Sequence, residues 1–338
     1  MKKKYIECLR IIAIILVIYN HTRELGFTLY QYTSDPCSYY LSVLMIPVCK
    51  TAVPLFLMIS GATLLGKEED YKYLFSRRIV RYVGIILFWG SLQYCRYVRT
   101  GKAEMSVRGW WNNIYSSPKL ETYWYLYLYL GFLILLPLLR KTVAGMRDQD
   151  YRYLFGLSCA GSVLTMFGYF SGCFINGSIF LLPSVFLYPL LGYWIDKAPR
   201  HNDRKDALKY SLTAILPLCV IVSACLIFEK NMDLNGDFMD AIQCLTPMIS
   251  FGIFGLIKSM DAGHRYSARL EKAVLAVGDT VFGIYLTEDM IRNQVFKLIV
   301  HIHANDFILA VLYTLLTFIL GVVFIAVMKK IPILKRLI

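Results

Sequence analysis

A histidine stands at the end of the first long apolar run of this chain, where a titrating side chain is unusual. His21 follows Asn20 and the unbroken run Ile11–Tyr19. Imidazole suits acid–base catalysis, because a pKa of about 6.5 lets it accept and return a proton at neutral pH. Glu24 lies three residues further on, so its carboxylate could hold an imidazole N–H if the helix continues. The pattern predicts His21 as a general base and Glu24 as its orienting carboxylate.

Arg10 closes the other end of the same apolar run. On a continuous helix, Arg10 and His21 are about three turns apart, so they share a face at roughly 16 Å along the axis. Glu7 precedes Arg10 by three residues and could pair with it. Arg10 is therefore a candidate to bind a phosphate or to stabilise developing negative charge. In the alternative interpretation the first span is short and His21 lies at the outer headgroups.

Three arginines crowd the stretch LFSRRIVRY at residues 74–82, namely Arg77, Arg78 and Arg81. Guanidinium groups bind phosphate with two parallel hydrogen bonds, so the cluster is a candidate site for a phosphorylated cofactor. The alternative is that these residues are ordinary topology signals beside a membrane span.

Two further segments carry polar side chains inside apolar surroundings. Glu288 and Asp289 interrupt the stretch GDTVFGIYLTEDMIRNQVF at residues 278–296, and Arg292 is placed to pair with Glu288. Trp124 belongs to an aromatic stretch that could equally form an interfacial belt. We assign substrate-binding roles to Trp124, Tyr285 and Glu288. We expect no metal site, because the sequence offers no third metal ligand to accompany His301 and His303.

The composition places the chain in the membrane class. Of its 338 residues 57% are hydrophobic and 17% are charged, whereas soluble domains have about 25% charged residues. The net charge of +13 would suggest nucleic acid in a soluble protein. Here basic loops that fix membrane topology explain it, so we expect no nucleic-acid partner.

Apolar runs of about 20 residues can cross a bilayer as helices. The sequence predicts an all-α polytopic helix bundle, a single domain over residues 1–338, with about ten transmembrane helices. The predicted spans are 6–25, 43–65, 80–98, 121–139, 153–171, 178–195, 207–228, 238–257, 274–298 and 306–328. Ser60 and Gly61 in the second span offer a small surface for close helix packing.

The positive-inside rule gives this map an orientation. With Lys2, Lys3 and Lys4 placed in the cytoplasm, most of the 36 lysines and arginines fall on the same side, and both termini are cytoplasmic. The exception is the basic outer loop after the third span. It also holds Trp110 and Trp111, which indicates an interfacial segment.

In their order along the chain, these motifs resemble the integral-membrane acyltransferase-3 family. The resemblance rests on Glu7, Leu9-Arg10, Ala13 and His21; Pro54-Leu55-Phe56 with Ser60-Gly61; Arg77, Arg78 and Arg81; Trp124-Tyr125-Leu126 with Pro137; and Phe282 to Leu286. It covers nearly the whole chain. The family's late motif usually continues to a histidine, where this chain has Thr287-Glu288.

The resemblance implies a multi-pass membrane enzyme, most simply in a bacterial plasma membrane. It would move an acyl group, commonly acetyl, from cytoplasmic acyl-CoA to a hydroxyl of a cell-surface glycan or similar acceptor. Arg77, Arg78 or Arg81 would hold the CoA phosphates, and His21 would act as base or carry the acyl group briefly. The expected partners are the lipid bilayer, acyl-CoA and the acceptor, and a homo-oligomer is compatible with them.

A transporter or flippase of a lipid-linked glycan or small anion is the alternative function, since kinked spans with buried charges fit it as well. Transporters commonly show internal repeat symmetry, which we do not find in this sequence. The arginine cluster that follows the histidine helix favours the acyltransferase.

Overall fold

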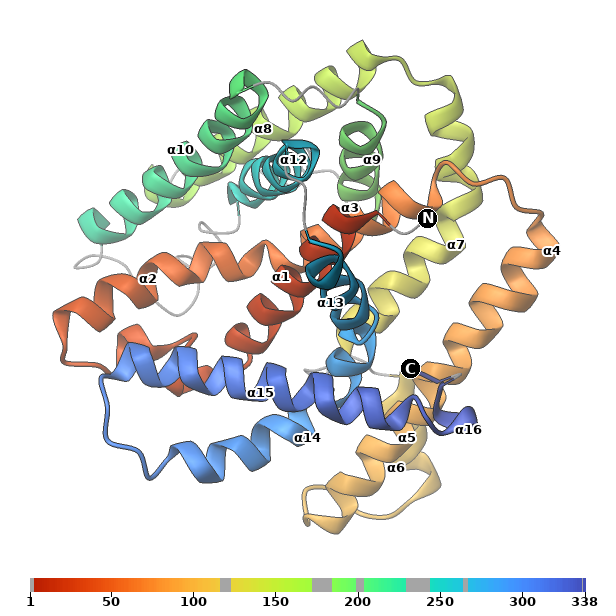
Figure 1. The fold of residues 1–338 in the computed structure, drawn as a ribbon, viewed down its shortest axis with the longest axis vertical. Coiled ribbons are helices and arrows are strands. Elements are labelled where there is room, and N and C mark those ends of the chain that lie inside the picture. Colours follow the sequence, from red (N-terminus) through yellow and green to blue (C-terminus); the bar gives the residue numbers. More distant parts are fainter. Residues whose placement is uncertain are drawn as a thin grey trace.

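The helices follow the predicted apolar runs. The computed structural model describes residues 3–115, 123–171, 184–198, 204–228, 244–263, 267–335 and 337–338. Every regular element in these ranges is helical, so the all-α prediction is confirmed for them. The main helices are α1 Lys4–Asn20, α2 Pro36–Lys50, α3 Ala52–Leu64, α5 Val80–Arg99, α7 Trp124–Gly145, α8 Asp148–Ser171, α9 Ser184–Lys197, α10 Arg204–Phe228, α12 Thr246–Gly263, α13 Ala268–Gly278, α14 Val281–Ile299 and α15 Asp306–Met328 (Figure 1).

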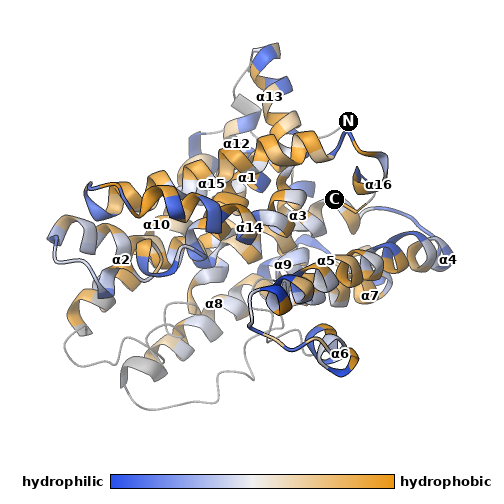
Figure 2. Ribbon diagram, turned by 90° about the horizontal axis from the view of Figure 1, so that it is seen from below, coloured by the Kyte–Doolittle hydropathy of each residue, from blue (hydrophilic) through white to orange (hydrophobic). Residues whose placement is uncertain are grey.

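The short elements lie between these helices. They are the 3-10 turns η1 Arg23–Leu25 and η2 Leu29–Gln31, the single turn α4 Tyr71–Tyr73, the π-helical segment η3 Leu74–Ile79, and the helices α6 Val107–Tyr115 and α16 Pro332–Lys335. Helix α6 carries both hydrophilic and hydrophobic residues (Figure 2). It contains Trp110 and Trp111, in the loop for which the sequence indicates an interfacial segment.

In the part of the chain that the structure describes, four spans are long and apolar enough to cross a membrane. They are Pro36–Leu64, Trp124–Gly145, Arg204–Ala224 and Asp306–Met328. Helices also occupy the other predicted spans, although residues 121–122, 178–183 and 238–243 of those spans lie outside the described residues. The total of about ten crossings and the cytoplasmic termini stay predictions.

Two predicted spans are interrupted. The span predicted at 43–65 starts earlier, because Pro36 is at the first turn and the Asp35 carboxylate accepts from the Ser38 N–H at 2.9 Å. It breaks at Thr51, between Pro47 and Pro54. Neither proline has an N–H to donate to the preceding turn, which weakens the helix on both sides of the break. The span predicted at 274–298 divides into α13 and α14.

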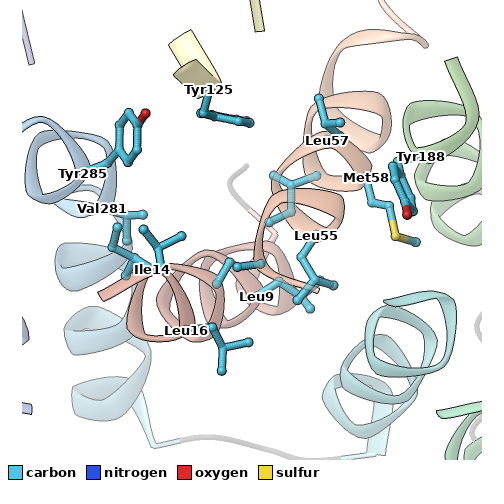
Figure 3. Close-up of a cluster of buried hydrophobic side chains, with 14 of the residues drawn as sticks. Leu9, Ile14, Leu16, Leu55, Leu57, Met58, Tyr125, Tyr188, Val281 and Tyr285 are labelled. Atoms are coloured by element: carbon cyan, nitrogen blue, oxygen red, sulfur yellow. The ribbon is translucent and has the colours of Figure 1, made fainter. Parts of the chain in front are cut away.

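Helix α1 lies at the centre of the bundle. It packs against α2, α3, α12, α13, α14 and α15 (Figure 1). Tyr5, Leu9, Ile14 and Ile18 are fully buried along it. Figure 3 shows Leu9, Ile14 and Leu16 in one cluster with side chains of α3 and α14. The helix that carries Arg10 and His21 is therefore held on several sides by apolar contact.

The contact between α3 and α9 depends on two glycines. A Cβ atom at Gly61 would overlap the Pro189 carbonyl, and one at Gly192 would overlap the Met58 carbonyl. This reciprocal close approach confirms the packing role predicted for Gly61.

A buried lysine fixes the end of α9. Lys258 of α12 is 6% exposed. Its Nζ donates to the carbonyls of Ile195 at 2.5 Å, Asp196 at 3.1 Å and Ala198 at 2.7 Å. Two of these carbonyls belong to the last turn of α9 and the third to the residue that follows it, where helical partners are lacking. The Asp196 carboxylate in turn accepts from Lys3 and Tyr5, which fastens α1 to the same point.

The close approach at Gly61 can be tested with one added methyl group. Gly61→Ala forces α3 and α9 apart, so we expect it to lower the free energy of unfolding by about 1–3 kcal/mol. Gly131→Ala is the matched control, because a Cβ there has no neighbour within 4 Å and alanine favours helix. Thermal unfolding in detergent measures both. Equal melting temperatures for the two variants would contradict the packing role.

Candidate functional site

His21 terminates α1 and contacts a buried carboxylate from α14. Its Nδ1 lies 2.7 Å from Oε1 of Glu288. The imidazole is 20% exposed, whereas the Glu288 carboxylate is completely buried. Because a carboxylate accepts the Nδ1 hydrogen, the Nε2 atom is left as the proton acceptor of a neutral imidazole. The pair therefore has the arrangement of a base and its orienting group.

Glu24 does not take the place that the sequence predicts for it. The prediction assumed a helix that continues through residue 24, but α1 ends at Asn20. The Thr22 hydroxyl then bonds to the Tyr19 carbonyl at 2.6 Å, and Arg23 has a positive φ of 52°. This turn removes Glu24 from the face of His21 and leaves it exposed in η1. Glu288 makes the contact instead.

Glu288 is also the first member of a chain of charges. Arg292 Nε lies 3.4 Å from Glu288 Oε2, which confirms the pairing predicted from their spacing. An Arg292 terminal nitrogen lies 2.8 Å from Asp289, which also pairs with Arg96 of α5. Burial of a carboxylate is costly unless cations and hydrogen-bond donors lie beside it. The chain of charges therefore keeps Glu288 able to hold the imidazole.

The imidazole opens into a cavity of about 500 Å³, which we call the His21 cavity. It is enclosed by α1, α2, α3, α7 and α14 together with residues of other helices. Trp124 and Tyr285, for which the sequence predicts substrate contact, both line it. Glu288 is not among the lining residues, but it contacts His21. Its further lining includes Asn20, Lys50, Phe56, Tyr125, Thr165, Ser184 and Thr246.

The arginine cluster lines a second cavity of about 500 Å³, which we call the basic cavity. Arg77, Arg78 and Arg81 lie there as a group, on or next to the π-helical segment η3. Arg10 joins them rather than His21, and its guanidinium pairs with Glu7 at 2.9 Å. Of the two roles predicted for Arg10, this position suits phosphate binding.

An acidic residue fixes one arginine of the basic cavity. Arg78 and Arg140 both pair with Glu69, which follows α3. Arg140 also donates to the Leu64 carbonyl at the end of α3, at 3.1 Å and 3.2 Å. Hydrogen bonds from Arg78 and then Arg140 lower the pKa of Glu69 to about 2, against the opposing effect of burial.

One aromatic wall separates the two cavities. Phe56, Tyr125 and Tyr285 line both of them. The ring centroids of Phe56 and Tyr125 are 5.8 Å apart, and those of Tyr125 and Tyr285 are 5.7 Å apart. Figure 3 shows Tyr125 and Tyr285 at the edge of the α1–α3 cluster. The two cavities are therefore neighbours that share these three side chains as their common border.

Two features of the site are absent from the sequence predictions. The contact of His21 with Glu288 joins residues 267 positions apart, which no local pattern encodes. Lys50 also lines the His21 cavity. The sequence contains a signal for this residue, because Lys50 is the one charged residue between Pro36 and Leu64. Within the described residues, no group of three or more His, Cys, Asp or Glu side chains is placed to hold a metal ion.

The Glu69 cluster gives a pH-dependent prediction. Because the folded pKa of Glu69 lies below the ordinary value of about 4.3, its stabilisation is present above that pH and is lost as the pH falls toward about 2. We expect Glu69→Gln to cost about 1–2 kcal/mol at pH 7 and progressively less below pH 4.

Thermal unfolding of Glu69→Gln and of the matched control Glu68→Gln, at pH 7 and at pH 3, measures this effect. Glu68 is exposed, so its substitution leaves the ion pairs intact. If Glu69→Gln lowers the melting temperature by the same amount at both pH values, the charge of the carboxylate is not the source of the lost stability.

Comparison with known proteins gives one match. A family model of the acyltransferase-3 type, described as an acyltransferase domain, matches residues 3–327. Searches of curated proteins and of solved structures gave no match.

Proposed function

This chain belongs to the acyltransferase-3 family and is a membrane acyltransferase, and from that premise we propose how its two cavities divide the reaction. Acyl-CoA, in the simplest case acetyl-CoA, binds with its phosphates in the basic cavity. Its acyl group reaches the His21 cavity, where a hydroxyl acceptor such as a surface glycan receives it. The observation that carries this proposal is that one aromatic wall borders both cavities.

The basic cavity has the chemistry that coenzyme A requires. Its lining includes Arg10, Arg77, Arg78, Arg81 and Lys329. CoA carries a pyrophosphate and a ribose phosphate, and guanidinium forks bind such groups with charge-assisted hydrogen bonds. Some of these cations already have partners, such as Glu69 for Arg78, so they are fixed in place before a ligand arrives.

The pantetheine arm would connect the cavities. Arg10 and His21 lie at the two ends of α1, roughly 16 Å apart along its axis at 1.5 Å per residue. A long, thin and flexible chain can cover that distance, whereas the nucleotide remains with the arginines. Side-chain rotation of Tyr125 and Tyr285 would admit the arm, and its thioester would then lie beside His21.

His21 would act as the general base. Its Nε2 takes the proton from the acceptor hydroxyl while the oxygen attacks the thioester carbonyl. The tetrahedral intermediate then collapses, the carbon–sulfur bond breaks, and the proton passes to the CoA sulfur. Glu288 accepts from Nδ1 and stabilises the transient imidazolium. In the alternative, His21 carries the acyl group briefly before the acceptor attacks.

Transfer of label from radiolabelled acetyl-CoA, in membranes that contain the protein, tests the role of His21. We expect His21→Ala to lower transfer by at least about 100-fold, the usual contribution of a general base. We expect Glu288→Gln to lower it by at least about tenfold, because the imidazole loses its orienting carboxylate. The matched control Glu24→Gln removes an exposed carboxylate and keeps wild-type activity. Full activity in His21→Ala would refute the proposed role.

The arginine cluster gives a separate prediction on donor binding. Arg77→Gln removes a charge-assisted contact to phosphate, so we expect the KM for acetyl-CoA to rise by about tenfold or more, with a smaller change in kcat. The control Arg152→Gln removes a guanidinium that pairs only at the surface, with Asp148. Equal KM values for the two variants would place the CoA phosphates elsewhere.

A further inference from the structure

We infer that the groove between α8 and α10 binds an anionic phospholipid, with the lipid phosphate at Lys205 and Lys209 and an acyl chain along α10. We call this space the α8–α10 groove. In the described part of the chain it shares no lining residue with the His21 cavity or the basic cavity. The inference therefore does not depend on the proposed reaction.

The α8–α10 groove lies on the outside of the bundle. Helices α8 and α10 each pack against α12 (Figure 1), and a space of about 870 Å³ lies between them. Leu208 and Leu216 of α10 line this space and are exposed. The span Arg204–Ala224 is also the least buried of the four described spans that are long and apolar enough to cross a membrane. The groove is therefore accessible to lipid.

One face of α10 forms the long apolar wall of the groove. Leu208, Leu212, Leu216 and Val220 recur every four residues, so they lie on the same side of the helix. From Leu208 to Val220 this wall is about 18 Å long at 1.5 Å per residue. The hydrocarbon core of a bilayer is about 30 Å thick, which is about 15 Å for each leaflet. The wall therefore has the length that one acyl chain needs.

The charged side chains of the groove are gathered at one end. Lys205 and Lys209 lie one turn apart at the start of α10, and both are exposed. The described lining contains no Asp or Glu, and Asp206, which lies between the lysines in sequence, does not line the groove. An apolar length with cations at one end is complementary to an amphiphile with an anionic head group. Basic pockets between membrane helices bind anionic phospholipids in this way.

The groove does not require its lysines to be free of other interactions. Lys209 Nζ lies 5.6 Å from the ring centroid of Tyr210. A hydrogen bond from Trp194 and then the charge of Arg152 lower the pKa of Asp148, and Lys209 adds a smaller contribution. An ammonium group has three N–H donors and is not saturated by one neighbour. A lipid phosphate can therefore bind beside these contacts.

The groove also borders the wall of the His21 cavity. Met166 and Leu245 line the groove, whereas their sequence neighbours Thr165 and Thr246 line the His21 cavity. The predicted orientation places Lys205 and Lys209 on the cytoplasmic side, whose leaflet carries anionic lipids. A lipid in the groove would support the wall that α8 and the start of α12 form. We therefore expect the lipid to stabilise the folded protein.

Thermal unfolding of the purified protein in a neutral detergent tests the inference. The additions are dioleoyl phosphatidylglycerol, dioleoyl phosphatidylcholine and glycerol 3-phosphate, which separate an anionic lipid from a neutral lipid and from a free phosphate. We expect phosphatidylglycerol to raise the melting temperature more than phosphatidylcholine does, and glycerol 3-phosphate to have no effect. Equal shifts with the two lipids, or an equal shift with glycerol 3-phosphate, would overturn the inference.

A double variant tests the two lysines. We expect Lys205→Gln with Lys209→Gln to raise the phosphatidylglycerol concentration for the half-maximal shift by at least about tenfold, because each lysine attracts an anionic lipid. The matched control, Lys102→Gln with Lys141→Gln, removes two exposed lysines elsewhere and has the same net charge. Its response should equal that of the wild type. An unchanged response in the Lys205 and Lys209 variant would refute the site.

A second pair of variants tests the apolar wall and leaves the lysines in place. Leu216→Trp fills the groove, so we expect the preference for phosphatidylglycerol to be lost. The matched control Leu320→Trp changes an exposed leucine of α15 that does not line the groove and should keep the preference. Full preference in Leu216→Trp would place the lipid outside the groove and overturn the inference. This pair decides the question if the double lysine variant does not fold.

Discussion

The buried carboxylate of Glu288 is the constraint on which the site depends. A fully buried carboxylate is tolerated only with compensating partners. One comes from a distant part of the chain, His21 at the end of α1, and the other is Arg292, one turn further along α14. Asp289 extends the chain of charges to Arg96 of α5. Loss of any partner would leave a charge unpaired in an apolar interior. The same interactions therefore hold three helices together and orient the imidazole.

The polar groups of the site lie where regular helices are interrupted. His21 follows the last residue of α1, Lys50 precedes the break at Thr51, and Arg77 and Arg78 lie on a π-helical segment. An interruption frees backbone groups, which membrane proteins accept where the backbone is buried in protein or lines a cavity. The uninterrupted surfaces between these points pack closely, as α3 does against α9 at Gly61 and Gly192. Rigid packing thus surrounds the irregular segments that carry the polar side chains of the candidate site.

Local patterns were sufficient for much of this structure. Apolar runs predicted where the helices lie, and spacing predicted the pairs Glu7–Arg10 and Glu288–Arg292. The prediction for Glu24 was wrong because it extended a helix past its end, and the turn at Thr22 and Arg23 was not recognised in the sequence. The contact between His21 and Glu288 depends on how α1 and α14 pack, and one sequence without relatives contains no local signal for that. For Lys50 the sequence does contain a signal, because it is the one charged residue between Pro36 and Leu64.

The central claim is that Glu288 acts through His21, and a double-mutant cycle on acyl transfer tests it most directly. Residues that act as one unit have non-additive effects on rate. The account predicts that Glu288→Gln has no further effect on the rate of transfer once His21 is alanine. The contradicting result is a double variant whose transfer rate lies below that of His21→Ala by the same factor as Glu288→Gln lowers the wild-type rate. The carboxylate would then act independently of the imidazole.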